Sequence, residues 1–113
     1  MKFLPQRRAI DSFGGGGFRF GDHSHQGHLL ILPSGMRAWD GKDFGAVLAE
    51  KDAIDFFVIG TGVIFVRLDA KVARQFFELG ISVDAMTTSA AIHSFNFMLK
   101  EERRVAAAFM AVP

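Results

Sequence analysis

The chain has 113 residues, which is enough for one domain with a sizeable core. Half of its residues are hydrophobic and 13 are Phe, so disorder and a collagen-like or mucin-like stalk are excluded. Thirteen Lys plus Arg against twelve Asp plus Glu leave a formal charge of +1, so no overall field attracts nucleic acid. There is no Cys, which excludes disulfides, Cys-ligated metals and thiol catalysis. We expect a single domain over residues 1–113, with its core at about 10–112, and no nucleic-acid partner.

The hydrophobic stretches argue against membrane insertion. Residues 1–8 contain charges and a proline where a signal peptide needs a continuous apolar stretch. The longest apolar run, residues 56–66, is interrupted by Gly60, Thr61 and Gly62 and is far shorter than the roughly 20 residues of a membrane helix. We expect a soluble, cytoplasmic protein.

The first third of the chain has the pattern of β structure. Phe18 and Phe20 alternate with a polar residue, which is typical of a half-buried strand. Residues 29–32 form a short apolar run, and a second run follows the Pro-Ser-Gly turn at 33–35. The pattern predicts antiparallel hairpins. Asp43 is predicted to cap a short helix across residues 44–49.

From residue 55 onward, strand and helix patterns alternate. Asp69 suits a helix cap and Gly80 suits the position just after a helix. The predicted order is strand 56–59, helix 70–79, strand 81–86, helix 87–101 and strand 105–110. This order is the signature of parallel βαβ units. Together with the antiparallel first third, it predicts a mixed α/β domain with two main helices.

Both predicted helices have an apolar side. At 100° per residue, one side of helix 70–79 carries Val72, Ala73, Phe76, Phe77 and Leu79. The apolar side of helix 87–101 carries Ala91, Ile92, Phe95, Met98 and Leu99. We expect these sides to pack on the sheet. Phe97 is the exception, because it lies among polar residues on the opposite side of its helix, and it is a candidate contact with another protein.

The segment Gly60-Thr61-Gly62 directly follows a predicted buried strand. Three interpretations are open: a structural turn, a dinucleotide site, or a contact with a small ligand or a partner at the carboxyl end of the strand. The dinucleotide fingerprint is incomplete, because Phe65 stands where its third glycine is needed and no helix begins after Gly62. We favour the structural turn and keep the contact as a candidate function.

The densest group of potential metal ligands comprises Asp22, His23, His25 and His28. In an extended strand His23 and His25 share a face while His28 points to the other, so the three converge only if the chain bends. We expect no metal and no other cofactor. No catalytic Ser motif and no pair of acids in an apolar setting is present, so the assignment as an enzyme stays open and we favour a protein that is not an enzyme.

Several motifs together resemble one family. They are the Leu-Pro-Ser-Gly turn at 32–35, Ile-Gly-Thr-Gly at 59–62, the strand 80–86, the helix residues 89–96 with Leu99, Glu101 and Arg103, and Val-Ala-Ala-Ala at 105–108. The chain is similar, over about residues 10 to 112, to a small single-domain family of prokaryotic proteins that also includes mitochondrial complex I assembly factor 3 and the adipogenesis-associated domain protein. The resemblance implies a three-layer α/β fold with a mixed central sheet and a smaller antiparallel β layer. It also implies action through protein partners, since the eukaryotic relatives assemble a respiratory complex.

The chain departs from the family pattern in its second helix. Where family members often have an acid, a thiol and an arginine, this chain has Thr87, Ile92 and His93. A catalytic scheme built on those groups is therefore not implied. The matching positions that carry over are Gly60, Thr61, Gly62, Thr88 and Asn96.

These observations lead to two functional hypotheses. The first is a protein-binding, assembly-factor-like module. It would use Gly60, Thr61, Gly62, Thr87, Thr88, Asn96 and Phe97. The alternative is a small-ligand binder or enzyme with a pocket where residues 60–62 meet Thr87 and Thr88. Homo-oligomers are compatible with both.

Overall fold

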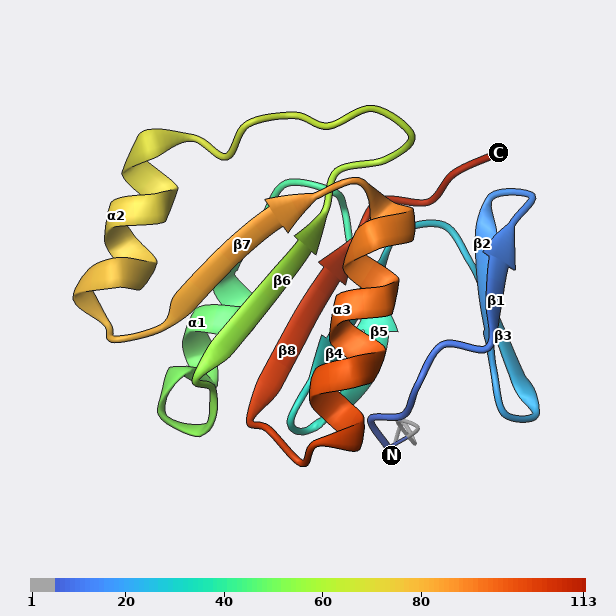
Figure 1. Cartoon of the computed structure of the whole chain (residues 1–113), viewed down its shortest axis with the longest axis horizontal. Coiled ribbons are helices and arrows are strands. Elements are labelled where there is room, and N and C mark those ends of the chain that lie inside the picture. Colours follow the sequence, from blue (N-terminus) through green and yellow to red (C-terminus); the bar gives the residue numbers. More distant parts are fainter. Residues whose placement is uncertain (1–5) are drawn as a thin grey trace.

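The computed structural model describes residues 6–113. At its centre is a five-stranded sheet with the strand order β5-β4-β8-β6-β7 (Figure 1). β4 (Leu29–Leu32) pairs antiparallel with β5 (Gly35–Ala38) and with β8 (Val105–Phe109). β6 (Phe56–Gly60) pairs parallel with β8 and with β7 (Ser82–Met86). The sheet is mixed, as predicted, with β6 in its interior and β7 at one edge.

A second, smaller sheet forms the antiparallel β layer. It consists of β1 (Ser12–Gly14), β2 (Gly17–Phe20) and β3 (His23–Gln26), paired in chain order. Phe18 and Phe20 are buried, and the ring of Phe18 stacks on that of Phe109 at 5.9 Å between centroids. The alternation of apolar and polar residues in β2 therefore predicted the buried face correctly, and this face packs against the central sheet.

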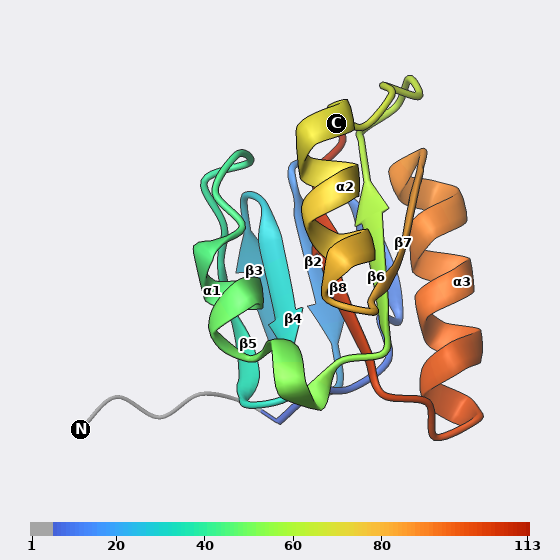
Figure 2. The same cartoon turned by 90° about the vertical axis from the view of Figure 1, so that its left-hand side faces the viewer.

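The helices complete the three layers. α3 (Thr88–Lys100) covers the same face of the central sheet as the small sheet, while α1 (Gly45–Ala49) lies on the opposite face (Figure 2). A short 3-10 helix, Lys51–Ala53, follows α1. The prediction that Asp43 caps α1 is wrong: the N-cap of α1 is Phe44, so the helix begins one residue later than predicted. The carboxylate of Asp43 instead accepts the N–H of Gly45 at 2.9 Å.

The prediction for α3 is confirmed. Thr87 is its N-cap, and its side chain accepts the N–H of Ala90 at 3.4 Å. The predicted apolar stripe faces the sheet: Ala91, Ile92 and Phe95 are buried, and Met98 and Leu99 pack against the same cluster.

The prediction for the buried side of α2 (Ala70–Glu78) is wrong at two positions. Asp69 caps this helix and Gly80 follows it with φ +75°, as expected. However, Phe76 is fully buried while Phe77 is 80% exposed and Leu79 is 39% exposed. α2 lies beside the edge strand β7 and so contacts the sheet with only a narrow stripe (Figure 1). Phe77 is turned 100° away from Phe76 around the helix, which directs its ring past the edge of the sheet.

Candidate functional site

The turn at Gly60, where β6 ends, lies in direct contact with the start of α3. A Cβ atom added to Gly60 would lie 2.9 Å from Cα and Oγ1 of Thr88 and 3.1 Å from the ring of Phe109. Both neighbours are packed in the core, so neither has room to move. Only glycine allows β6 to approach α3 this closely.

Thr88 ties three segments together at this turn. Its side chain is fully buried, and it is the only buried polar residue found within residues 6–113. Its hydroxyl accepts the N–H of Gly62 at 2.9 Å and donates to the carbonyl of Met110 at 2.7 Å. A buried hydroxyl with both of its roles satisfied stabilises the native arrangement. Thr88 thus links the start of α3, the turn after β6 and the chain after β8.

Thr61 organises the loop that connects β6 to α2, which comprises residues 61–69. Its N–H donates to the carbonyl of Met86 at 2.8 Å, which extends the ladder between β6 and β7. Its hydroxyl donates to the carbonyl of Ile64 at 3.1 Å and accepts the N–H of Val66 at 3.0 Å. One side chain therefore closes the loop on itself, as short polar side chains commonly do in turns.

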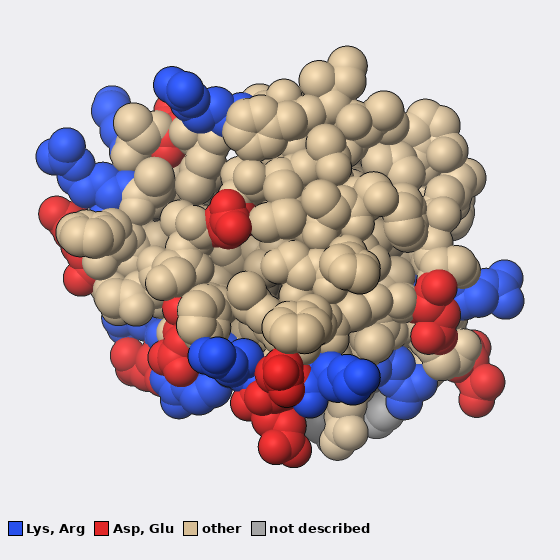
Figure 3. All heavy atoms as spheres, viewed as in Figure 1, with Lys and Arg blue, Asp and Glu red and all other residues tan. Residues whose placement is uncertain are grey.

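The loop displays four consecutive apolar side chains to solvent. We call them the apolar tip: Val63 is 67% exposed, Ile64 76%, Phe65 54% and Val66 59%. In the space-filling view, the upper rim of the molecule, along which Figure 1 draws this loop, carries few charged side chains (Figure 3). Large contiguous apolar patches on protein surfaces are commonly sites of interaction, so the apolar tip is a candidate contact surface.

The exposure of the apolar tip was not predicted, because residues 63–66 lie in the apolar run 56–66 but beyond the predicted strand 56–59, and no structure was predicted for them. A signal was present, since Gly60 and Gly62 divide that run. A strand commonly has about five or six residues, so the apolar residues after Gly62 are too many to belong to the same strand as residues 56–60.

Asn96 and Phe97 are neighbours in α3 with different environments. The side chain of Asn96 is engaged at both ends by one residue: its Oδ1 accepts the N–H of Ile10 and its Nδ2 donates to the carbonyl of Ile10, each at 2.9 Å. Asn96 thereby attaches the N-terminal segment to α3. Phe97 is 61% exposed and presents its ring to solvent.

A cavity of about 380 Å³ lies beside Thr61. Its walls are mainly apolar, with Trp39, Phe44, Leu68 and Val72 among them, and Lys42, Arg67 and Asp69 lie at its border. Its volume is within the range of small-molecule sites. Thr87 and Thr88 do not line this cavity, so it differs from the predicted pocket where residues 60–62 meet Thr87 and Thr88.

Two of the three histidines, His25 and His28, are hydrogen-bonded to backbone groups of the chain itself. Nε2 of His25 lies 2.9 Å from the carbonyl of His28, and Nδ1 of His28 accepts the N–H of Ala111 at 2.8 Å. In the part of the chain that the structure describes, no three side chains of His, Asp or Glu form a group that could hold a metal ion. Likewise, none of the helices in residues 6–113 is long and apolar enough to cross a membrane.

The fold and the turn define a class of protein: a three-layer α/β domain in which a mixed sheet is covered by helices on both faces and by a small β layer on one. The chain belongs to the family described as "Protein of unknown function (DUF498/DUF598)", which matches residues 10–110. Both expectations of the sequence analysis, the family and the three-layer fold, are thereby confirmed.

Proteins similar to this chain include an uncharacterized bacterial protein and proteins named as assembly factors. An uncharacterized protein of Rhodobacter capsulatus is 32% identical over 105 residues, covering 92% of this chain and 85% of the relative. The human protein named "NADH dehydrogenase (ubiquinone) 1 alpha subcomplex assembly factor 3" is 28% identical over 97% of this chain, which spans 67% of it. The zebrafish (Danio rerio) protein of the same name is 29% identical, and this chain spans 64% of its length.

Solved structures share the fold. A chain described as an outer membrane protein from Bartonella henselae is 41% identical, with a TM-score of 0.92 and coverage of 98% of this chain and 100% of that one. The Rpa2829 protein from Rhodopseudomonas palustris is 36% identical, with a TM-score of 0.86 and coverage of 100% and 90%.

Proposed function

We propose that this chain is a protein-binding domain that takes part in the assembly of a larger complex, and that the apolar tip is its main contact. The observation that carries the proposal is the exposure of Val63–Val66, each more than half exposed on a loop that Thr61 holds in shape. Apolar side chains fixed in this way bind a partner at low entropic cost, because the loop is already ordered.

The predicted site residues divide into two roles under this proposal. The loop is positioned by Gly60, Thr61, Gly62 and Thr88. Thr87 caps α3, and Asn96 attaches the N-terminal segment to this helix. Phe97 adds an exposed aromatic side chain on α3, a residue type enriched at protein interfaces. The role in assembly is supported by similarity to the proteins named as assembly factors.

The test is affinity capture with the full chain as bait and quantitative mass spectrometry of the bound proteins. The variant carries Ile64→Ser and Phe65→Ser. The matched control is Phe13→Ser, which changes another exposed Phe outside the loop. We expect a partner whose recovery falls at least ~10-fold with the loop variant, the effect of losing about 1.4 kcal/mol or more, and is unchanged with the control. Identical partner sets for all three proteins would overturn the proposal.

The cavity beside Thr61 supports a second candidate function, the binding of a small ligand. Its apolar walls and few charged border residues fit a metabolite with an apolar body and one polar end. Thermal-shift screening against a metabolite panel would detect a ligand as a rise in Tm. Val72→Phe narrows the cavity and should abolish that rise; a panel without any hit would count against this candidate.

A further inference from the structure

β7 is an edge strand whose outer backbone groups have no partner in the described chain. The N–H of Ser82 donates to the carbonyl of Asp55, and the carbonyl of Met86 accepts the N–H of Thr61, so these two residues face β6. Backbone direction alternates along a strand, and Val83 and Ala85 must therefore direct their N–H and C=O groups away from β6. Within residues 6–113, no hydrogen bond engages these four groups.

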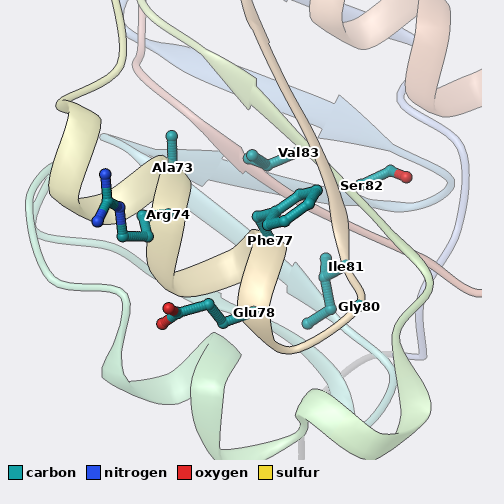
Figure 4. A pocket seen from close by; sticks show the side chains of 8 residues that line it. All are labelled: Ala73, Arg74, Phe77, Glu78, Gly80, Ile81, Ser82 and Val83. Carbon is teal, nitrogen blue, oxygen red and sulfur yellow. The ribbon is translucent and has the colours of Figure 1, made fainter.

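A groove lies beside the first part of this open edge, where Ser82 and Val83 line it. It lies between α2 and β7 and has a volume of about 900 Å³. Phe77 projects from α2 toward β7, with Ala73 and Val83 beside it and Arg74 and Glu78 at the outer border (Figure 4). The ring of Phe77 is 80% exposed. An apolar surface therefore lies directly beside unused backbone donors and acceptors, which is the combination that an added strand requires.

We propose that an extended segment of a partner protein binds in this groove and adds to β7 as a further strand of the central sheet. Val83 and Ala85 supply its backbone hydrogen bonds. The side chains of Val83 and Ala85 belong to the core cluster on the α2 side, whereas Asp84 is exposed on the other face. The partner segment thus alternates: apolar side chains cover Phe77, and a Lys or Arg lies opposite Asp84.

A second copy of this chain does not fit the same edge. Antiparallel pairing of two β7 strands about a two-fold axis would place both α2 helices on the same side of the joined sheet. α2 lies on the open side of its own β7 (Figure 1), so the two α2 helices would meet across joined strands that are only about 4.8 Å apart. Packed helices need about 8–10 Å between their axes. The groove therefore accommodates a single extended segment.

This inference rests on the proposed protein-binding function but uses a surface separate from the apolar tip. The probe is a phage-displayed library of random linear 12-residue peptides, selected on the full chain. Two variants test the groove. Phe77→Ala removes its apolar wall, and Ala85→Pro removes one outward N–H while leaving the ladder with β6 intact, as prolines in edge strands do. Phe97→Ala, at another exposed Phe on a helix, is the matched control.

We expect selected peptides with alternating apolar residues and a Lys or Arg. Their affinity should fall at least ~10-fold for both groove variants and stay unchanged for Phe97→Ala and for the loop variant Ile64→Ser with Phe65→Ser. Bound peptide should also slow amide exchange at Ala85. Phe77 is exposed, so the Phe77→Ala variant should fold normally. It therefore still tests the groove if the Ala85→Pro variant does not fold. The inference is overturned if no peptide is enriched or if the peptides bind the Phe77→Ala variant as well as the wild type. It is also overturned if the peptides lose binding only to the loop variant. A dimer of the free chain that Phe77→Ala or Ala85→Pro dissociates would overturn it as well.

Discussion

Two hydrogen bonds join Thr88 and Gly62. The N–H of Thr88 donates to the carbonyl of Gly62 at 2.9 Å, and the hydroxyl of Thr88 accepts the N–H of Gly62 at the same distance. Because the hydroxyl also donates to Met110, one buried side chain holds the base of the loop that carries the apolar tip.

Replacing this hydroxyl should destabilise the protein. Thr88→Val keeps the side-chain volume but leaves the N–H of Gly62 and the carbonyl of Met110 without their partner. We expect a loss of about 2–3 kcal/mol in the free energy of unfolding, measured by urea titration. Ser89→Ala, at the adjacent exposed position, should change it by less than about 0.5 kcal/mol. Equal stability of Thr88→Val and the wild type would show that the hydroxyl is not needed.

The side chain of Asn96 should act mainly on the N-terminal segment. Asn96→Leu has a similar volume and removes both hydrogen bonds to Ile10. We expect a loss of about 1–2 kcal/mol and faster amide exchange at Ile10 than in the wild type. His93→Ala, also on the outer side of α3, is the control and should leave both quantities unchanged. An Ile10 amide that remains equally protected in Asn96→Leu would contradict this role.

Phe76 and Phe77 form a natural pair for testing the position of α2. Phe76 is fully buried against Phe57, with ring centroids 5.0 Å apart, whereas Phe77 is 80% exposed. Phe76→Ala should therefore cost about 3–5 kcal/mol because it leaves a cavity. Phe77→Ala should stay within about 0.5 kcal/mol of the wild type. Chemical denaturation of the two variants measures the difference, and similar losses for both would mean that Phe77 is covered in solution.

Asp40 should contribute a pH-dependent stabilisation. The backbone N–H groups of Asp43 and Lys42, each 2.8 Å from Oδ1, hold the pKa of Asp40 below its ordinary value of 3.8. A carboxyl whose pKa is lower in the folded than in the unfolded state stabilises the fold above the unfolded pKa, and this stabilisation is lost as the pH falls through the folded pKa. The stability difference between the wild type and Asp40→Asn should thus be present near pH 6 and shrink progressively as the pH falls below 3.8 and through the folded pKa. A difference that is independent of pH would contradict the assignment.

Much of the fold could be predicted because its signals are local. Alternation of apolar and polar residues predicted β2, the cap Asp69 predicted the start of α2, and the stripe of α3 predicted its buried side. Each signal depends on residues within one or two turns of one another. Spatial neighbours far apart in sequence, such as Asn96 and Ile10, leave no such pattern.

The candidate site could be predicted only in part. Gly60, Thr61 and Gly62 were identified as a turn after a buried strand, and Phe97 as an exposed aromatic residue. The exposure of Phe65 and Phe77 was not predicted, because an apolar side chain has the same sequence signature whether or not another layer covers it.

The sequence by itself determined which elements form, since hydrogen-bonding capacity, side-chain period and capping are properties of short segments. Only the tertiary structure decided which apolar surfaces remain open. The chain places β7 at the edge of the sheet and α2 beside it, so Phe76 reaches the core while Phe77 does not. Burial depends on which layers meet in space, and that is settled by contacts among residues distant along the chain.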